Sequence, residues 1–345
     1  MALHPLFSTR LPVIQAPMAG VQGSALAIAV SNAGGLGSLP CAMLGADGLR
    51  KELMAIKAQT DRPYNVNFFC HVPTPVDAQR EAAWKASLAP FYKALGIDMG
   101  DAAPGPSRSP FDVQMADVLA EFKPPVVSFH FGLPSPELLA HVKSWGATVT
   151  SSATTLDEAR WLEAHGADVI IAQGLEAGGH RGMFLTSDLT TQVGTFALLP
   201  QIIRAVRLPV VAAGGIADAQ GVRAAMALGA AAVQVGTAYL LCPEATTSAI
   251  HRRALKSDAA RHTALTNLFT GRPARGIMNR FMREHGPMSD VAPAFPLATS
   301  AMMPLRTAAE ALGSGDFSPL WSGQNASGCK EISAAELTRE LAGER

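Results

Sequence analysis

Cysteine is scarce in this sequence: its 345 residues include four, and no two of them form a C-x-x-C pair. A chain of this length can bury a large core without disulfide bonds, so this usage indicates a reducing compartment. The first residues lack a basic stretch followed by a long apolar run, so we expect no signal peptide. No apolar run free of turn signals reaches the roughly 18 residues that a membrane span needs. We therefore expect a cytoplasmic protein.

The sequence also lacks a charge of one sign, because Lys+Arg and Asp+Glu both number 28. A nucleic-acid binder would carry a basic stripe, so we expect no nucleic-acid partner, whereas a small anionic substrate remains compatible. No His, Cys or carboxylate group has metal-ligand spacing such as H-E-x-x-H, so we expect no metal. Hydrophobic residues make up 48% and charged residues 16%, so much of the chain must be core.

Short apolar runs alternate with alanine-rich helical patterns along most of the chain. The runs are continuous rather than alternating, as in strands of a parallel sheet covered on both faces. Eight such strands predict an α/β fold, a parallel (β/α)8 TIM-type barrel over residues 1–238. The expected strands are residues 13–16, 35–38, 65–69, 126–129, 148–150, 169–172, 210–213 and 233–235.

Two stretches interrupt this rhythm. Residues 70–125 contain many prolines and form a long excursion after the third strand. Residues 239–325 are helical in pattern, with a proline-rich break at 286–304, and residues 326–345 predict a C-terminal helix. Additions on the active face of a barrel commonly cover the site, so we expect residues 239–325 to form a helical lid.

Glycines follow the last two predicted strands. Gly214 and Gly215 precede a helix that begins near Asp218, and Gly236-Thr237 ends the final strand. Glycine lets backbone N–H groups approach a phosphate, and a helix N-terminus adds a favourable dipole. Barrels build phosphate sites from these two loops, so the pair predicts one, with two ordinary glycine turns as the alternative.

A glycine-rich loop around one histidine follows the sixth predicted strand, in the sequence QGLEAGGHRG from Gln173 to Gly182. The imidazole of His180 could move a proton or supply positive charge to an anion, with an incidental surface histidine as the less favoured alternative. His71 and His130 sit at strand ends and could also line the cavity. Five further histidines lie in polar helical stretches, where we expect solvated roles: His141, His165, His251, His262 and His285.

Two further segments could contact a flat ligand. Ala16-Pro17-Met18 ends the first strand, and Met18 offers a polarizable group, although methionine also serves as core filler. Asn67 is an amide flanked by apolar neighbours. Either a flavin ring edge or a neighbouring backbone could satisfy it, and the sequence leaves that choice open.

Together these segments resemble the first class of nitronate monooxygenases, formerly called 2-nitropropane dioxygenases. The similarity runs in order along nearly the whole chain. The matching segments are residues 11–20 (LPVIQAPMAG), 31–38 (SNAGGLGS), 64–71 (YNVNFFCH), 127–134 (VSFHFGLP), 173–182 (QGLEAGGHRG), 212–216 (AAGGI), 234–237 (QVGT), 271–281 (GRPARGIMNRF) and 321–324 (WSGQ).

The resemblance implies non-covalently bound FMN and the oxidation of alkyl nitronates, such as propionate 3-nitronate, by O2 to carbonyl compounds and nitrite. It implies that His180 is catalytic, as a base or as a holder of the anion. It also implies a set of flavin-binding positions, to which we add their neighbours Ala16, Pro17, Gly214 and Val235. The positions are Met18, Asn67, Gln173, Gly178, Gly179, Gly215, Gln234, Gly236, Thr237 and, from the tail, Gln324.

Two other functions fit the same barrel, because fold does not fix function. One is an NAD(P)H-dependent FMN reductase, such as a flavin-type enoyl-acyl-carrier-protein reductase or a quinone reductase. The other is a non-catalytic barrel that binds a phosphate ligand. We expect FMN rather than FAD, since no G-x-G-x-x-G fingerprint opens a βαβ unit.

Overall fold

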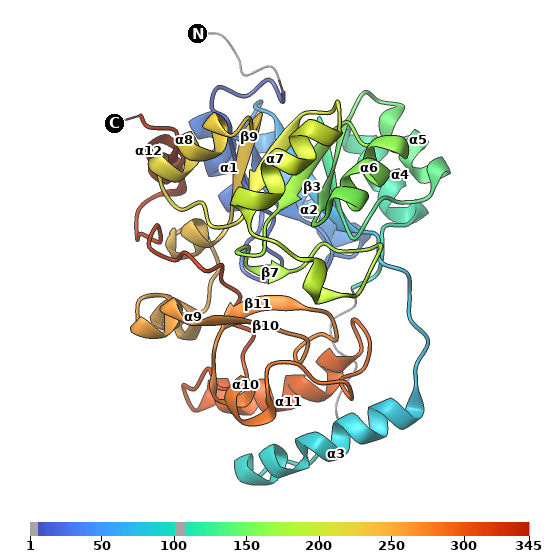
Figure 1. Cartoon of the computed structure of the whole chain (residues 1–345), viewed down its shortest axis with the longest axis vertical. Helices are drawn as coiled ribbons and strands as arrows, with labels where there is room; N and C mark the ends of the chain where they lie inside the picture. Colours follow the sequence, from blue (N-terminus) through green and yellow to red (C-terminus); the bar gives the residue numbers. More distant parts are fainter. Residues whose placement is uncertain (1–5, 101–107, 345) are drawn as a thin grey trace.

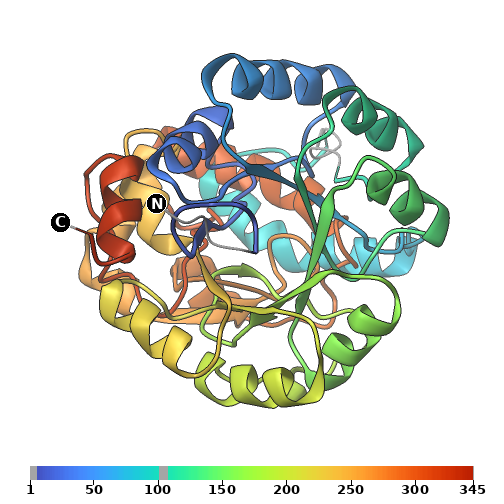
Figure 2. The same ribbon diagram turned by 90° about the horizontal axis from the view of Figure 1, so that it is seen from above.

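Eight parallel strands form a ring in the computed structural model, which describes residues 6–100 and 108–344. The hydrogen-bonded order is β1-β9-β8-β6-β5-β4-β3-β2. Leu36 N–H donates to the carbonyl of Val13 and Gln15 N–H to that of Leu36, both at 2.9 Å, so the ring is nearly closed (Figure 2). The predicted barrel is confirmed. Its strands are β1 (Val13–Gln15), β2 (Gly37–Pro40), β3 (Tyr64–Phe69), β4 (Val126–His130), β5 (Thr148–Ala153), β6 (Val169–Gln173), β8 (Val210–Ala213) and β9 (Ala232–Val235).

Helices surround this ring because the strands carry apolar side chains on both faces. Buried aliphatic residues such as Leu26, Leu162 and Ile202 fill the layer between strands and helices. Inside the ring, Ile14 and Val211 belong to a separate apolar cluster. The outer helices are α1 (Ser24–Ala33), α2 (Ala46–Gln59), α4 (Val113–Phe122), α5 (Pro136–Lys143), α6 (Leu156–Ala164), α7 (Thr195–Ala205), α8 (Ala219–Ala227) and α12 (Ala334–Leu341).

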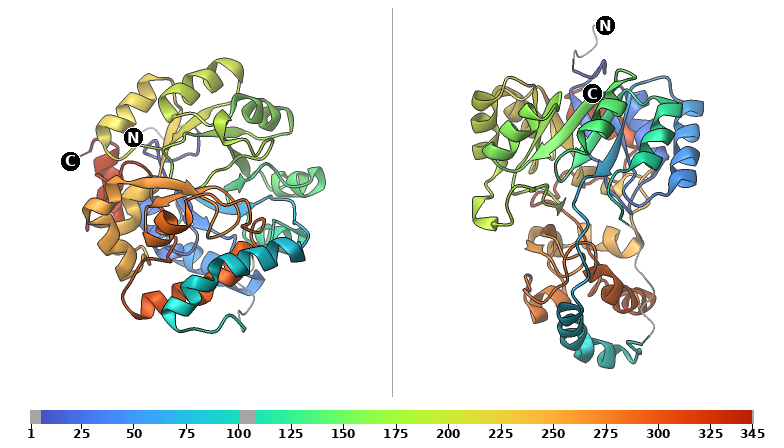
Figure 3. Two further views of the ribbon diagram at one scale, coloured as in Figure 1. Left: turned by 60° about the horizontal axis from the view of Figure 1, so that its bottom comes forward. Right: turned by 90° about the vertical axis from the view of Figure 1, so that its right-hand side faces the viewer.

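A second region, which we call the lid, lies below the carboxyl ends of the barrel strands in Figure 1. Two distant parts of the chain build it. The excursion after β3 supplies α3 (Ala78–Leu95), which packs on α11 (Ala298–Ala311) at the far side of the lid (Figure 3). Trp84 and Leu88 of α3 share a buried core with Phe281 and Leu305. The excursion is therefore part of the lid and contributes to its hydrophobic core.

The excursion is shorter than expected. Residues 113–122 form α4, a barrel helix that packs against α2 and α5, so the excursion ends by residue 112. Of the predicted stretch, residues 101–107 lie outside the described residues.

Residues 239–325 form a lid that contains helices, as expected, but they also contain strands that were not expected. Besides η2 (Thr237–Leu241), α9 (Ala249–Leu255), η3 (Asp258–Arg261), α10 (Arg280–His285) and α11, the lid contains an antiparallel hairpin of β10 (Thr263–Thr266) and β11 (Ala274–Ile277). Strand β11 also pairs with β7 (Gly179–His180), which follows β6 and precedes η1 (Leu189–Thr191). These strands are too short to create a readable periodicity. Only the tertiary structure brings their edges together.

The end of the chain returns to the barrel. Helix α12 packs against α1 and α8 and so occupies the position of the eighth outer helix. Thr338 of α12 exchanges a hydrogen bond of 2.8 Å with the buried hydroxyl of Tyr239. The lid is thus inserted within the third and eighth β/α units, at the carboxyl ends of their strands. In the described ranges, 6–100 and 108–344, no helix is long and apolar enough to cross a membrane.

Candidate active site

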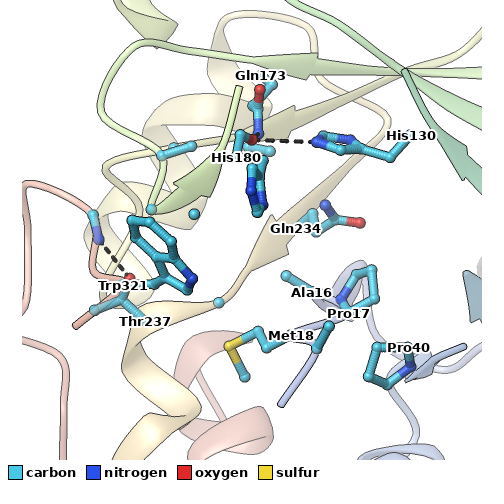
Figure 4. Close-up of a pocket in the computed structure, with 18 of the residues that line it drawn as sticks. Ala16, Pro17, Met18, Pro40, His130, Gln173, His180, Gln234, Thr237 and Trp321 are labelled. Atoms are coloured by element: carbon cyan, nitrogen blue, oxygen red, sulfur yellow. Dashed lines mark hydrogen bonds between the residues drawn. The ribbon is translucent and has the colours of Figure 1, made fainter. Parts of the chain in front are cut away.

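A cavity lies between the carboxyl ends of the barrel strands and the lid. It collects most of the predicted site residues from separate loops, and Figure 4 shows several of them facing one another. Its lining includes Ala16, Pro17, Met18, Asn67, His130, Gln173, Gly178, Gly179, His180, Gly214, Gly215, Gln234, Gly236 and Thr237.

Two predicted residues do not line this cavity. The side chain of Val235 is buried in the core between strands and helices, because alternate side chains of a strand point to opposite faces. Gln324 is exposed, and its backbone N–H donates to the carbonyl of Glu176 at 2.9 Å. Its neighbours Gly323 and Asn325 line the cavity instead.

His180 is held by the lid sheet. It lies on β7, opposite Ala274 of β11, and its ring enters the cavity from the side that faces the lid. The ring Nε2 lies 2.9 Å from the hydroxyl of Thr270. Burial and the positive charge of Arg108 lower the pKa of His180 well below its usual value, so the imidazole is neutral near pH 7.

The backbone of His180 is fixed from the barrel side. His130 Nε2 lies 3.2 Å from the His180 carbonyl, and since a carbonyl only accepts, Nε2 carries the proton. His130 Nδ1 then accepts from the hydroxyl of Ser152 at 3.1 Å. Burial lowers the pKa of His130 to about 3, which keeps this ring neutral. His130 lines the cavity as expected, with both nitrogens engaged.

Gln173 and Arg181 shape the loop that carries His180. Gln173 donates to the His180 carbonyl at 3.0 Å and accepts from Gly182 N–H at 2.7 Å, so its amide braces the loop. The fully buried guanidinium of Arg181 donates to the carbonyls of Gln173 and Gly174, both at 2.7 Å. The side chains of Gln173 and Arg181 therefore hold the backbone of the glycine-rich loop through hydrogen bonds.

The two predicted phosphate loops follow the neighbouring strands β8 and β9, and both line the cavity. Gly214 and Gly215 have φ values of 117° and 73°, a region that other residues rarely adopt. In the part of the chain that the structure describes, the N–H groups of Gly214, Gly215 and Gly236 donate to no other group. Free N–H donors at the ends of two neighbouring strands, one of them just before a helix, suit a phosphate, and the phosphate site itself stays a prediction.

Other cavity residues offer atoms that suit a polar aromatic ring. Gln234 Oε1 is buried and has no hydrogen-bond partner among the described residues, so a ligand donor would satisfy it. Asn67 lines the cavity, and its NH2 group donates to Ser128 Oγ at 2.9 Å, so this group has a protein partner, while a contact between Asn67 and a flavin stays a prediction. These observations fit a ligand that carries a polar aromatic ring and a phosphate.

Sequence reasoning missed several residues around the cavity. The cations Arg108 and Arg272 both act on the pKa of His180, and Arg108 lines the cavity. The Arg272 guanidinium lies 3.9 Å from the centre of the Phe131 ring. Arg272 lies in the segment 271–281 that resembles the family, but neither arginine was singled out, because each comes from a lid segment whose fold the sequence did not reveal.

Two histidines also differ from expectation. His251 was expected to be solvated, but its side chain is buried and lines the cavity, with burial lowering its pKa to about 4. His71, a candidate for the lining, lies instead in an aromatic cluster, 4.8 Å from Phe295 between ring centres.

Among the residues described, no three His, Cys, Asp or Glu side chains gather in a way that could hold a metal ion.

Comparisons with known proteins agree with this geometry. A model of the nitronate monooxygenase family matches residues 1–344. The chain is 45% identical to a nitronate monooxygenase of Paraburkholderia phytofirmans, over 99% of this chain and 93% of the relative. It is 44% identical to one of Pseudomonas aeruginosa, over 97% and 96%.

Solved structures show the same relationship. A nitroalkane oxidase from Streptomyces ansochromogenes superposes with a TM-score of 0.89 at 41% identity, over 98% of this chain and 96% of that one. FabK from Thermotoga maritima has a TM-score of 0.71 at 28% identity, over 98% and 93%. The chain belongs to the nitronate monooxygenase family of flavin-dependent oxidoreductases.

Proposed function

We propose that this enzyme binds FMN and oxidises alkyl nitronates, such as propionate 3-nitronate, with O2 to carbonyl compounds and nitrite. One observation carries the proposal: a neutral imidazole, His180, shares a cavity with a glycine-lined pair of loops whose N–H groups are free. When bound, FMN supplies the redox chemistry by taking electrons from the substrate and passing them to O2.

The barrel residues would bind and orient the cofactor. Gly214, Gly215 and Gly236 would direct backbone N–H groups at its phosphate, at the carboxyl ends of the last two strands. Gln234 Oε1 would accept from the edge of the ring, and Met18 would lie against an apolar part of it. No part of this arrangement needs Val235 or the side chain of Gln324.

The lid residues would act on the substrate. A nitronate is an anion, and the cations Arg108 and Arg272 stabilise negative charge beside His180. The neutral imidazole accepts a proton from an uncharged nitroalkane or donates a hydrogen bond to a nitronate oxygen. Aromatic side chains of the lid, including Phe295 and Trp321, pack around the ring and exclude water.

The test is the absorption spectrum of the purified protein, mixed with propionate 3-nitronate without oxygen. We expect a flavin spectrum that the nitronate bleaches and O2 restores, with no nicotinamide nucleotide present. Heat-released flavin should run as FMN in chromatography, and FAD would contradict the cofactor assignment. Turnover only with NADH or NADPH would favour a reductase, and a colourless protein would favour a phosphate-ligand binder.

The cellular setting is also part of the proposal. All four cysteines are free in the structure, which suits a reducing compartment such as the cytoplasm. The balanced charge of the chain supports a small-molecule substrate rather than a nucleic acid.

A further inference from the structure

A single hydroxyl group contacts the imidazole of His180 in the lid. Thr270 is buried in the loop between β10 and β11, and its Oγ1 lies 2.9 Å from His180 Nε2. The ring centres of Phe295 and Trp321 lie 5.3 and 5.6 Å from that of His180, so apolar surfaces flank the imidazole. No other hydrogen bond reaches a His180 ring nitrogen from the described ranges. Among the described residues, the Thr270 hydroxyl is therefore the hydrogen-bonding group that can favour one neutral tautomer of His180 over the other.

The direction of this hydrogen bond follows from a second contact. Thr270 Oγ1 also lies 3.4 Å from the carbonyl oxygen of Arg272, to which it donates. A hydroxyl has one hydrogen, so while it donates to the carbonyl it can only accept from His180 Nε2–H. If the hydroxyl donated to Nε2 instead, the Arg272 carbonyl would receive no hydrogen bond from the residues described. When Nε2 carries the proton, the Thr270 hydroxyl makes both hydrogen bonds, to His180 Nε2 and to the Arg272 carbonyl. When Nδ1 carries the proton, the hydroxyl donates to Nε2 and the bond to the Arg272 carbonyl is lost.

We propose that Thr270 is a positioning residue that holds neutral His180 as the Nε2–H tautomer and so leaves the lone pair on Nδ1. The His180 ring points from β7 toward Gln234 and Ala16, into the cavity (Figure 4). Nδ1 takes a proton from the carbon that bears the nitro group of a neutral nitroalkane. The electron pair of that C–H bond moves onto the nitro group, giving a nitronate anion beside an imidazolium.

This inference rests on the proposed function, because only an uncharged nitroalkane needs a base. It also predicts a split between substrates. A preformed nitronate has already lost its proton, so its oxidation does not need the Nδ1 lone pair.

The first measurement is spectroscopic and independent of turnover. Long-range 1H–15N correlation spectra of histidine-labelled, flavin-loaded protein distinguish the two neutral tautomers, and His180→Asn assigns the signal. We expect the Nε2–H tautomer in the wild type and in Thr270→Ser, and a shift toward Nδ1–H in Thr270→Val. A wild-type His180 with its proton on Nδ1 would overturn the proposal, even if the valine variant failed to fold.

The second measurement is kinetic. We expect Thr270→Val to lower kcat/KM for nitroethane by about 10–100-fold, the scale of losing the partner that orients a functional histidine. Activity on ethyl nitronate should change by less than about threefold, and Thr270→Ser should restore most of the nitroethane activity. Equal losses on both substrates would overturn the positioning role.

A matched control separates this role from the general effect of changing a buried threonine. Thr266 is fully buried in the same hairpin, and within the described ranges its hydroxyl accepts only from Leu268 N–H, at 3.2 Å. Thr266→Val should leave both the His180 tautomer and the ratio of nitroethane to ethyl nitronate activity unchanged. If Thr266→Val shifts the tautomer and this ratio as much as Thr270→Val does, the proposal is overturned. If the tautomer depends on Thr270 as expected but even the wild type does not oxidise nitronates, the proposed function fails and the role of Thr270 stands.

Discussion

The barrel and the lid contribute different things to one cavity. The barrel supplies backbone groups, at Gly214, Gly215 and Gly236, whose positions follow from the ends of regular strands. The lid supplies side chains that surround one imidazole, from segments far apart in the sequence. We infer that the barrel determines whether the cofactor binds, and that the lid determines what happens to the substrate.

This division has a physical reason. A phosphate needs N–H donors and a local dipole, and the chain presents both wherever a glycine turn joins a strand to a helix. Setting the protonation of a histidine needs burial, charges and one well-placed hydrogen bond, which only a closed environment provides. The predictions below test whether the two regions separate in this way.

The largest expected effect is on the lid side, at His180. Replacing it with asparagine should lower activity on neutral nitroalkanes by roughly 10²–10⁴-fold, the usual contribution of a positioned base. Activity on preformed nitronates should fall far less, and FMN should stay bound because barrel backbone groups hold it. Both substrates are assayed on one flavin-loaded preparation. Full activity on both would remove His180 from the mechanism.

The second prediction concerns the lid core. Trp84 of α3 is buried against the rest of the lid, so Trp84→Ala should destabilise the lid by about 3–5 kcal/mol. Limited proteolysis should then cut the lid while the barrel still binds flavin with weakened affinity. Thermal unfolding followed by circular dichroism and by flavin fluorescence measures the two regions separately. A single shared transition, shifted as one, would show that barrel and lid unfold together.

The third prediction concerns the barrel loop at Gly215. A valine there adds a side chain beside the free N–H groups at a φ of 73°, so FMN affinity should fall by about 10–100-fold, as expected for losing one or two bonds to a charged phosphate. Gly313 is a matched control, because its φ is 75° and a Cβ there meets nothing within 4 Å. Gly313→Val should carry similar backbone strain and keep its flavin. Flavin titration and circular dichroism measure binding and folding, and equal flavin loss in both variants would attribute the effect to strain.

The smallest expected effect is the response to pH. Burial and the charge of Arg108, with contributions from His130, Arg272 and His71, lower the pKa of His180 well below 6.5. A base with a lowered pKa is already deprotonated above that value and loses activity only when the pH falls through it. We therefore expect kcat/KM for neutral nitroethane to show no acid-side decrease between pH 8 and about 6.5. A fall centred near pH 6.5 would mean that His180 lies in a more solvated environment than the lid provides.

Much of the barrel could be predicted from the sequence because its signals are local. Each strand, such as residues 65–69, is a continuous apolar run, and each is bounded by a helix or a turn within a few residues. The glycine loops after the last two strands were recognisable for the same reason. His180 could be selected because glycines surround it in the sequence.

The lid could not be predicted in the same way. Strands β7, β10 and β11 contain two to four residues each, and β7 and β11 pair across some ninety positions of sequence. The excursion after β3 was recognised as an interruption, yet nothing local showed that α3 would pack on α11.

By itself, the sequence determined the barrel, the glycine loops and the histidine that lines the cavity, since short-range periodicity and turn chemistry encode all three. Only the tertiary structure decided that Gln173 braces a loop, that His251 is buried, and that Thr270 is the polar partner of His180. Those roles depend on which atoms meet across distant segments. Burial and hydrogen-bond direction are properties of the packed molecule, and no window of sequence contains them.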